Sequence, residues 1–561
     1  MENKELTAKL LRRFETLQTV RKLNEDQRWF AMAIANHRTK SASLSPSPVP
    51  DIVRHTSVTM NAIDDFCNFF VGNLVSPNLP WLGMQYESND DNMTDQDDIP
   101  EANEYIGGIK KKVMSEMAAS NFYPQNTLST KDEFIGANSA VLVTNDPNRN
   151  ICVYRTLTPW DYWTDVDQYG EYDTLFYKKN MNLSQAYEMF GEKLPKWMLK
   201  VISEGDPFEF WCDFLLCIYP RSKVYTKKRS AFVKNKRFAV VWMYLGSTTN
   251  SNAGKAEIID ESGIDYFPAM VSSWDYDGDN QYGTSPVIRK VDDLKRADKL
   301  AYESFLSLMK MNHPAYNGVR QSYDGFSDDP GSRNIVPSME MAAQPIPLTQ
   351  NLEGAMSMQE KQEALVQRMF NNDMFNYLSR NENAKVYTAT QVNAVKSEQL
   401  SLLAAVFGNY QRRIEKLVFL TVMTMVDNNR LPEGAKDIFN SNGKLRIIIE
   451  SALAQELRAY TNRDASIALL EQCMVYHNLG WDSNLNNFDK DQMIRGIASG
   501  LGVDYKVIRP KTDVQEENEA IAQMQQQQMQ LQNEYTRSEI NRNNAGAANL
   551  NNAQGANQYG G

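Results

Sequence analysis

Apolar residues recur at three- and four-residue steps after Ser285, and this spacing predicts a long helix from Pro286 to about Met311. Serine is a common helix cap, and proline suits the first helical position because its missing N–H would have no partner there. At 1.5 Å per residue the helix would be roughly 39 Å long. His313 and Pro314 then end it. Its apolar stripe consists of Val287, Val291, Leu294, Ala297, Ala301, Phe305 and Leu308.

A second pattern of helical period covers residues 352–378, after a segment of predicted strand and turn at 315–347. Two long helices joined by a non-helical insert form a stalk with a tip. Because a lone stalk would leave apolar stripes in water, we expect neighbouring copies of the chain to cover them. The second stripe consists of Ala355, Met358, Leu365, Met369, Phe370, Met374 and Tyr377.

The rest of the chain mixes both periods, which predicts an α+β fold. Helical spacing covers residues 6–37, 57–74, 99–121 and 389–428, with a further helix at 452–477 and a shorter one at 489–499. Period two, typical of strands, appears in the segments AVLVTN, NICVYRTL, YDTLFYKKN, FWCDFLLCIYP, FAVVWMYL, AEIIDE and KLRIIIE.

Proline and low-complexity segments mark the connections. Pro77, Pro80 and Trp81 predict an extended turn between two helices. Residues 510–561 are rich in glutamine, then in asparagine, glycine and alanine, which predicts a polar helix followed by a disordered tail.

Composition excludes several classes of protein. The chain has 59 basic and 70 acidic residues, a net charge of −11, so it is not a polycationic nucleic-acid binder. Its five cysteines form no C-x-x-C pair, which is typical of a reduced protein without disulfides or a zinc site. The sequence contains no G-x-x-x-x-G-K-[ST], G-x-S-x-G or H-E-x-x-H motif, and we expect no cofactor and no catalysis. We also expect a soluble protein, because no apolar run is long enough to span a bilayer.

One carboxylate cluster, Asp275, Asp277 and Asp279, resembles the first positions of a calcium loop. Glycine stands at the fourth position of the cluster instead of the sixth, and Pro286 stands where a bidentate glutamate is required. The segment is therefore interpreted as a turn into the long helix and not as a metal site. A metal-dependent DNA enzyme built on these three aspartates is the alternative function from another class.

Charged residues of both signs lie on the first half of the long helix. On an isolated helix such a set forms a solvated face with pairs three or four residues apart. In a ring of stalks the same set would bridge copies or line a channel. The sequence favours the first interpretation and leaves the second open. The residues are Asp292, Asp293, Lys295, Arg296, Asp298 and Lys299.

Several short motifs, in order along most of the chain, resemble the portal, or head-to-tail connecting, proteins of podovirus-like tailed phages. YGTSPVIRKVDDLKRADKL, at residues 282–300, is similar to the turn that leads into the family's stem helix. The others are PNLPWLGM at 77–84, SNF at 120–122, GANSAVLVTND at 136–146, PR at 220–221, PG at 330–331, YTATQV at 387–392 and ESALAQE at 450–456.

The resemblance implies a portal-type subunit that forms a dodecameric ring at one capsid vertex. Its parts would be an N-terminal wing and body at 1–284, a stem helix at 285–312, a clip at 313–350 and a returning stem helix at 351–380. A tunnel loop at 381–388, a long wing helix at 389–430 and a crown at 431–509 would follow, with the glutamine-rich helix and tail at 510–561. Another ring-forming tail adaptor is the remaining alternative.

The resemblance also implies the sites and partners. Double-stranded DNA would pass through the channel and meet the tunnel loop, whose candidate contacts are Asn381, Asn383, Lys385 and Tyr387. The candidate stem interface is Val287, Val291, Leu294, Ala301, Phe305, Leu308, Leu365, Met369 and Phe370, and the candidate clip residues are His313, Pro314, Pro330 and Gly331. Further partners would be the terminase large subunit, a tail adaptor, and the major capsid and scaffolding proteins, with no membrane. The protein would reside in the virion, and in the host cytoplasm during assembly.

The stem assignment carries an expectation about substitutions. Leu294→Asp or Ala301→Asp would put charge into the seam between copies and should disrupt ring assembly more than folding.

Overall fold

The computed structural model divides into two compact units, Met1–Tyr460 and Thr461–Gly561. The described residues of the second unit are helical and exposed, in agreement with the polar helix that the glutamine-rich pattern predicts. The structure describes residues 3–22, 25–39, 49–86, 99–223, 236–247, 255–277, 280–318, 320, 326–327, 333–336, 338–346, 352–370, 389–432, 434, 445–451, 454, 523–524, 526–532, 536–538 and 540.

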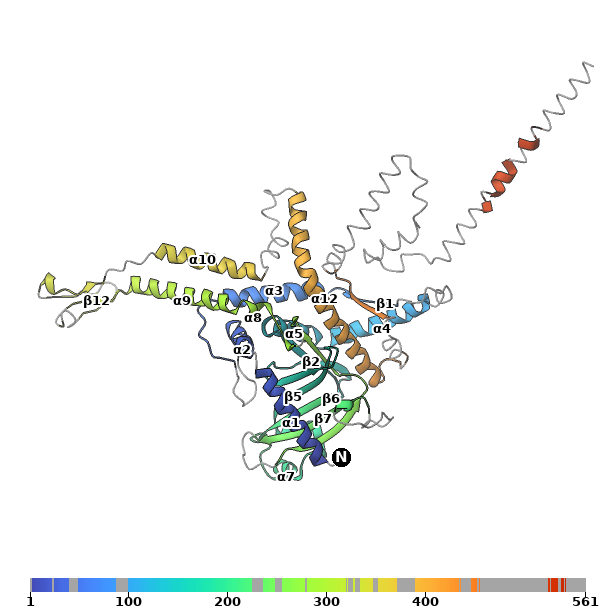
Figure 1. Ribbon diagram of the computed structural model, residues 1–561, viewed down its shortest axis with the longest axis horizontal. Helices are drawn as coiled ribbons and strands as arrows, with labels where there is room; N and C mark the ends of the chain where they lie inside the picture. The colour runs from blue at the N-terminus through green and yellow to red at the C-terminus, as the bar shows by residue number, and fades with distance from the viewer. Residues whose placement is uncertain are drawn as a thin grey trace, which may run out of the picture. The chain divides into compact units, whose positions relative to one another are not determined.

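Five helices form the N-terminal part of the first unit (Figure 1): α1 (Asn3–Lys22), α2 (Glu25–Ile34), α3 (Val58–Leu74), α4 (Ile99–Ala119) and α5 (Phe122–Gly136). Their apolar faces follow the helical spacing of the sequence. Helix α1 buries Leu6, Leu10, Phe14 and Leu17 against one face of a sheet. Helix α3 contributes Phe66 and Phe70 to the largest core cluster, where Phe66 stacks on Phe134 of α5 with ring centroids 4.5 Å apart.

The larger sheet is a five-stranded antiparallel meander in the order β4-β5-β6-β7-β8. Its strands are β4 (Tyr162–Val166), β5 (Tyr172–Asn182), β6 (Trp211–Pro220), β7 (Phe238–Ser247) and β8 (Glu257–Ile264). Between β5 and β6 lie α6 (Leu183–Phe190), a short 3-10 turn at Gly191–Lys193 and α7 (Lys196–Glu204), which cover Phe214 and Tyr244 of the sheet. The strands that alternation predicts in this region are confirmed.

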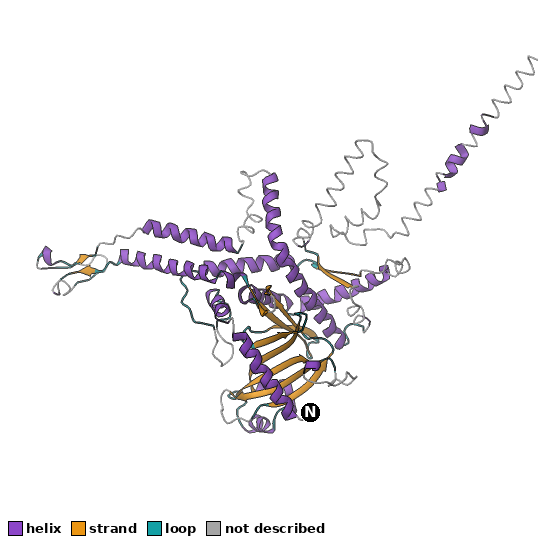
Figure 2. Cartoon of the chain, in the orientation of Figure 1, coloured by secondary structure: helices purple, strands orange, loops and turns teal. Residues whose placement is uncertain are grey.

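A three-stranded sheet in the order β3-β2-β9 packs beside the meander (Figure 2). Strand β2 (Asn138–Asp146) pairs antiparallel with both β3 (Ile151–Thr156) and β9 (Ala269–Ser273). Apolar residues of both sheets share one cluster, which includes Leu142 and Val271 from the smaller sheet and Leu175 and Ile218 from the larger one. A separate two-stranded sheet, made of β10 (Asp275–Asp277) and β11 (Asn280–Thr284), forms a hairpin after β9.

The expected turn around Trp81 is only part of the structure of that segment. Residues Leu82–Tyr86 form strand β1, which pairs antiparallel with β14 (Leu445–Ile449), the predicted KLRIIIE strand. Glu450 N–H donates to Trp81 O at 2.6 Å and closes the pair. The strand was not predicted because its partner lies far along the chain, and prolines at its start favoured a turn.

After the sheets come the short helix α8 (Pro286–Arg289) and the long helices α9 (Val291–Asn312), α10 (Leu352–Met369) and α12 (Ala389–Asp427). Helix α12 has 39 residues and confirms the prediction of a very long helix. Its C-terminal half lies in the main core, with Ile414, Leu417 and Val418 fully buried. The predicted crown at 431–509 lies almost entirely outside the described residues.

Candidate functional site

The stem-like pair of helices begins at a tightly packed turn. Gly283 has no space for a side chain, because a Cβ atom there would lie 2.0 Å from both the Asp275 carbonyl oxygen and Ser273 Oγ. The buried Ser285 hydroxyl accepts from Ile288 N–H at 3.1 Å and donates to the Ile135 carbonyl at 2.9 Å. The predicted cap and the proline at the first helical position are therefore confirmed, and the cap also ties the helix start to α5.

The expected continuous helix from Pro286 to Met311 is interrupted at Lys290. Lys290 N–H donates to Val287 O at 3.2 Å, a bond three residues back, before α9 continues with Leu294 N–H donating to Lys290 O. The Lys290 ammonium donates to the carbonyl of Met369 at the end of α10 and lies 5.5 Å from the centre of the Phe370 ring. Burial lowers the pKa of Lys290. The lysine therefore joins the break in one helix to the end of the other.

The first half of α9 rests on the N-terminal part of the chain. The Asp298 carboxylate accepts from the backbone N–H groups of His55 and Thr56 at 2.8 and 3.2 Å. The His55 and Tyr302 rings lie 4.2 Å apart, and the Lys295 ammonium lies 4.2 Å from the centre of the Phe30 ring. These contacts hold the base of α9 in place.

The structure divides the residues of the predicted stem interface into two groups. Val287, Val291, Leu294, Ala301 and Phe370 are buried by the chain itself. Phe305, Leu308 and Leu365 are 56%, 43% and 43% exposed, and Met369 is half-buried. Of these predicted interface residues, only the second group offers a surface to another molecule in the single chain.

Exposed large apolar side chains continue along the distal part of both helices and the insert between them. Helices α9 and α10 lie side by side, and their far end carries a small antiparallel pair, β12 (Tyr316–Asn317) and β13 (Gln344–Pro345) (Figure 1). An apolar surface of this extent is typical of an interaction site. Its members are Phe305, Leu308, Met309, Met311, Ile335, Met339, Ile346, Met356 and Met358.

The predicted clip and tunnel-loop residues are only partly described. His313 caps the end of α9, where its N–H donates to Met309 O at 2.8 Å, and Pro314 follows it. Tyr316 contacts Phe326 with ring centroids 5.0 Å apart. The other predicted residues, Pro330, Gly331, Asn381, Asn383, Lys385 and Tyr387, lie outside the described part of the chain.

The charges on α9 form pairs within the helix. Lys295 lies 3.4 Å from Asp292, Arg296 lies 3.7 Å from Asp293, and Lys299 lies 3.7 Å from Glu303. These spacings are those of a solvated helix face, the interpretation that the sequence favours. Exposed pairs of this kind contribute little to stability.

The structure describes two of the three aspartates of the alternative metal site, Asp275 and Asp277. The Asp275 carboxylate pairs with the Arg289 guanidinium at 2.5 Å, Asp277 ends strand β10, and Asp279 is not described. Within the described residues no group of three or more potential metal ligands occurs. A metal-dependent enzyme therefore has no support from this structure.

Sequence reasoning missed a buried ion pair between α12 and α5. The Arg413 guanidinium donates to the Glu133 carboxylate at 2.8 Å, and to Asn126 Oδ1 and Thr130 Oγ1, both at 2.6 Å. The Ser272 hydroxyl also donates to Glu133. Burial raises the pKa of Glu133, whereas the nearby Arg413 opposes that rise. The available signal was an arginine at helical spacing within an apolar stripe.

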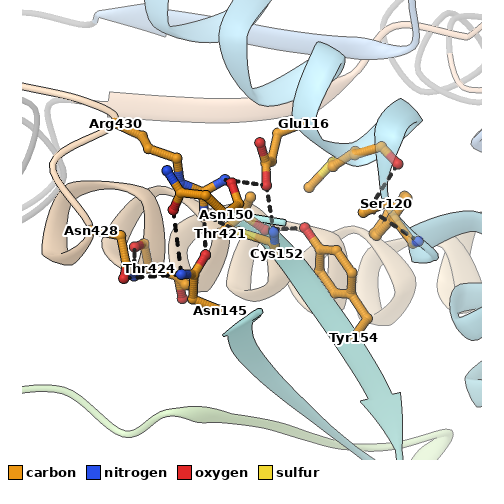
Figure 3. Close-up of polar contacts among 12 residues, drawn as sticks. Glu116, Ser120, Asn145, Asn150, Cys152, Tyr154, Thr421, Thr424, Asn428 and Arg430 are labelled. Carbon is orange, nitrogen blue, oxygen red and sulfur yellow. Dashed lines mark hydrogen bonds and ion pairs between the residues drawn. The ribbon is translucent and has the colours of Figure 1, made fainter. Parts of the chain in front are cut away.

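A second missed network gathers around Arg430, just after α12 (Figure 3). Its guanidinium donates to Glu116 Oε1 at 2.5 Å, the Asn150 carbonyl at 2.8 Å, Asn145 Oδ1 at 2.9 Å and Cys152 Sγ at 3.2 Å. Arg430 thereby joins the end of α12 to α4 and to the β2–β3 hairpin. Burial raises the pKa of the Cys152 thiol to about 12, so the thiol stays protonated and unreactive at neutral pH.

The described residues contain no helix with the length and apolar character needed to cross a membrane. The described residues provide a firmly anchored pair of helices with an apolar distal surface. Such a surface suits assembly better than chemistry.

Comparison with known proteins agrees with an assembly role. The family model described as bacteriophage head to tail connecting protein matches residues 7–508. The probable portal protein of Bordetella phage BPP-1 is 23% identical over 460 residues, which cover 79% of this chain and 77% of that protein. The portal protein of Salmonella phage epsilon15 is 21% identical over 352 residues, covering 62% of this chain and 61% of that protein. Because the family match spans most of its length, the chain belongs to the bacteriophage head to tail connecting protein family.

Proposed function

We propose that this chain is the portal protein of a tailed phage. Its copies would assemble a dodecameric ring at one capsid vertex, through which double-stranded DNA passes during packaging and ejection. The observation that carries the proposal is the family match over residues 7–508, and the portal names of both relatives support it.

The described elements suit the parts of such a subunit. Helices α8, α9 and α10 would be the stem, residues 313–350 the clip and residues 381–388 the tunnel loop. Residues 1–284 and helix α12 would form the wing, and residues 431–509 the crown. The exposed apolar side chains of the distal stem, Phe305, Leu308 and Met358 among them, would be covered by the neighbouring copy.

A ring contact of this kind is heterologous and closes by rotation, so each copy uses two different faces of its stem. Permanent interfaces commonly bury roughly 2,000 Å² or more. That requirement explains why one helix pair exposes apolar residues along the whole distal part of both helices.

The acidic composition suits a conduit. A channel that neutralised many phosphates would bind DNA tightly through counterion release and slow its passage. Twelve copies at −11 each would total about −132, which leaves the duplex loosely held. The tunnel-loop side chains Asn381, Asn383, Lys385 and Tyr387 are proposed as the few points of contact.

The ring would need partners at each end. We assign docking of the terminase large subunit and of a tail adaptor to the clip region, and contacts with the major capsid and scaffolding proteins to the wing. The protein would be a structural component of the virion, assembled in the host cytoplasm, without catalytic activity of its own.

Electron microscopy of the purified chain tests the proposal. Negatively stained particles should be rings of roughly twelve-fold symmetry with a central hole. A stable monomer, or a ring without an open channel, contradicts a portal. DNA cleavage that depends on magnesium and is lost in Asp275→Asn would instead revive the enzyme alternative.

A further inference from the structure

A hollow of about 560 Å³ lies between strand β5 of the larger sheet and helix α6, and residues of strand β3 of the smaller sheet and of the segment after β3 also line it. Its volume is typical of a pocket for a small ligand. Arg155 comes from β3, Lys178 and Lys179 come from β5, and Gln185 comes from α6. Thr158 and Asp161 lie in the segment that leads into β4.

Some charges of the hollow already have partners. The Lys178 ammonium lies 2.9 Å from the carboxylate of Asp213, which also accepts from the Asn180 side-chain amide at 2.7 Å. Burial raises the pKa of Asp161 to about 6, although the positive charges of Arg21 and Lys178 oppose that rise. Lys178 is therefore already paired with Asp213, and Asp161 brings a further negative charge to the hollow when it is deprotonated.

Two cations remain. In the part of the chain that the structure describes, neither Arg155 nor Lys179 has a carboxylate within ion-pair distance. The Arg155 guanidinium lies over the Tyr177 ring, 5.7 Å from its centre. Burial, together with the positive charge of Arg155, lowers the pKa of Lys179 to about 8. The other carboxylate at the hollow, Glu188, is exposed at the rim on α6.

Lys179 is half-buried, and Arg155 is exposed at the edge of the hollow. The two like charges repel each other, and a bound anion would remove that cost. A guanidinium offers a planar fork of donors to an oxyanion, and an ammonium adds a point charge. The Gln185 amide and the Thr158 hydroxyl line the same hollow and supply neutral donors. Chloride could neutralise the positive charge, but it could not accept the paired hydrogen bonds that the planar guanidinium offers.

We propose that this hollow binds a phosphate group between Arg155 and Lys179. The inference does not rest on the portal function, because it concerns the seam between the two sheets and not the stem. The phosphate could belong to a small solute, such as inorganic phosphate or a mononucleotide, or to a nucleic-acid backbone. Trp211 lines the hollow as well and offers an aromatic surface beside the phosphate.

Binding should depend on pH in a defined direction. Lys179 must be protonated to hold an anion, so affinity should increase as the pH falls through about 8. Protonation of Asp161 near pH 6 removes a negative charge from the hollow and should increase affinity again. Sulfate is the appropriate probe for this measurement, because it keeps both charges over the whole range whereas phosphate itself titrates.

Isothermal titration of the full-length chain with inorganic phosphate, at constant ionic strength, tests the site. We expect saturable binding by the native chain and at least a tenfold weaker Kd in Arg155→Gln, in Lys179→Gln and in the double variant. The control is Lys200→Gln, which removes an exposed lysine near Glu204 on α7 and should leave the Kd unchanged. Absence of phosphate binding by the native chain, or equal binding by the double variant, overturns the proposal.

Two further measurements separate a binding role from a structural one. Removing unpaired cations should keep or raise the melting temperature without ligand, whereas a structural role for them predicts a lower one. Added phosphate should raise the melting temperature of the native chain but not of the double variant. Competition between phosphate and a short DNA duplex identifies a backbone phosphate as the ligand, and competition by a mononucleotide alone identifies a small solute.

Discussion

The two halves of helix α9 share one sequence pattern but differ in what covers them. In the basal half, Val291 and Leu294 lie in the chain's own core, and Asp298 holds the backbone of His55 and Thr56. In the distal half, Phe305 and Leu308 continue the same stripe but are 56% and 43% exposed. Helical periodicity therefore reports that a face is apolar, but not whether the same chain or another molecule covers it.

The difference has a physical cause in the contacts of the base. Ser285 ties the start of the helix to α5, and Lys290 ties the helix break to the end of α10. These contacts fix the direction of α9 before it leaves the core. The distal half is then presented at a defined angle, which lowers the entropic cost of joining a partner.

The largest effect should come from the network behind the base. In Arg413→Met, the buried Glu133 carboxylate loses its charged partner, and removing one partner of a buried pair costs about 3–5 kcal/mol. We expect the free energy of unfolding to fall by that amount, measured by chemical denaturation of the purified protein.

The matched control for this variant is Lys299→Met on α9, where the lysine is exposed and pairs with Glu303 at 3.7 Å. Its effect on stability should stay within about 0.5 kcal/mol. Equal losses in the two variants would mean that the buried pair does not hold the core around the base.

A leucine pair on α9 tests the two halves directly. Leu294→Ala removes a fully buried side chain and should cost about 2–5 kcal/mol, whereas Leu308→Ala should change the stability of the dissociated chain by less than about 0.5 kcal/mol. Urea unfolding at a concentration where the chain is monomeric compares them. A similar loss in both variants would show that Leu308 is also covered within its own chain.

The difference between the two halves of α9 changes the expected effect of aspartate substitutions in the stem. The sequence led us to expect that Leu294→Asp and Ala301→Asp disrupt assembly more than folding. Both residues are buried within the chain, so the new carboxylate would have to be buried without a partner. Loss of folding is the expected result at both positions, and the assembly test belongs to residues farther along α9.

The parts of the fold that depend on local pattern were predicted from the sequence. Alternation predicted strands β2, β3 and β5 to β8 but not β4, and helical spacing predicted α3, α9 and α12 because each has a continuous apolar face. Strand β1 was missed, since its pairing with β14 depends on a segment far along the chain. The break at Lys290 was missed for the same reason, because the lysine's partner is Met369 on another helix.

The candidate site divides in the same way. The cap at Ser285 and the apolar stripe of α9 follow from residue type and spacing and could be predicted. Which members of the stripe are exposed could not, because burial depends on the elements that pack beside the helix. The networks of Arg413 and Arg430 join helices to strands and helices far away in the sequence. A local sequence pattern therefore could not predict the partners of these two arginines.

A smaller effect should follow from removal of the link between the two stem helices. Lys290→Met keeps an unbranched aliphatic side chain but removes the hydrogen bond to the Met369 carbonyl and the contact of the ammonium with the Phe370 ring. Because the ammonium is half-buried and not fully desolvated, we expect a cost of about 1 kcal/mol. Hydrogen exchange should show faster opening of the end of α10, with no change in the core of the larger sheet.

Lys290→Arg provides the control for this variant, since an arginine retains the charge and can still donate to a carbonyl. It should restore most of the protection of α10. If Lys290→Met leaves exchange at the end of α10 unaltered, the lysine does not couple the two helices.

The smallest effect on stability should accompany a large effect on assembly. The double variant Phe305→Ser, Leu308→Ser changes two exposed residues, so the free energy of unfolding of the single chain should shift by less than about 1 kcal/mol. If the neighbouring copy covers these side chains, each substitution removes a buried apolar contact worth about 1.5–3 kcal/mol from the subunit interface. This loss is repeated at every interface of a closed ring. Light scattering after size exclusion should therefore show native-like chains that no longer form rings. Rings that survive the double substitution at low protein concentration would place the subunit contact elsewhere, and the distal half of α9 would then be a surface for another partner.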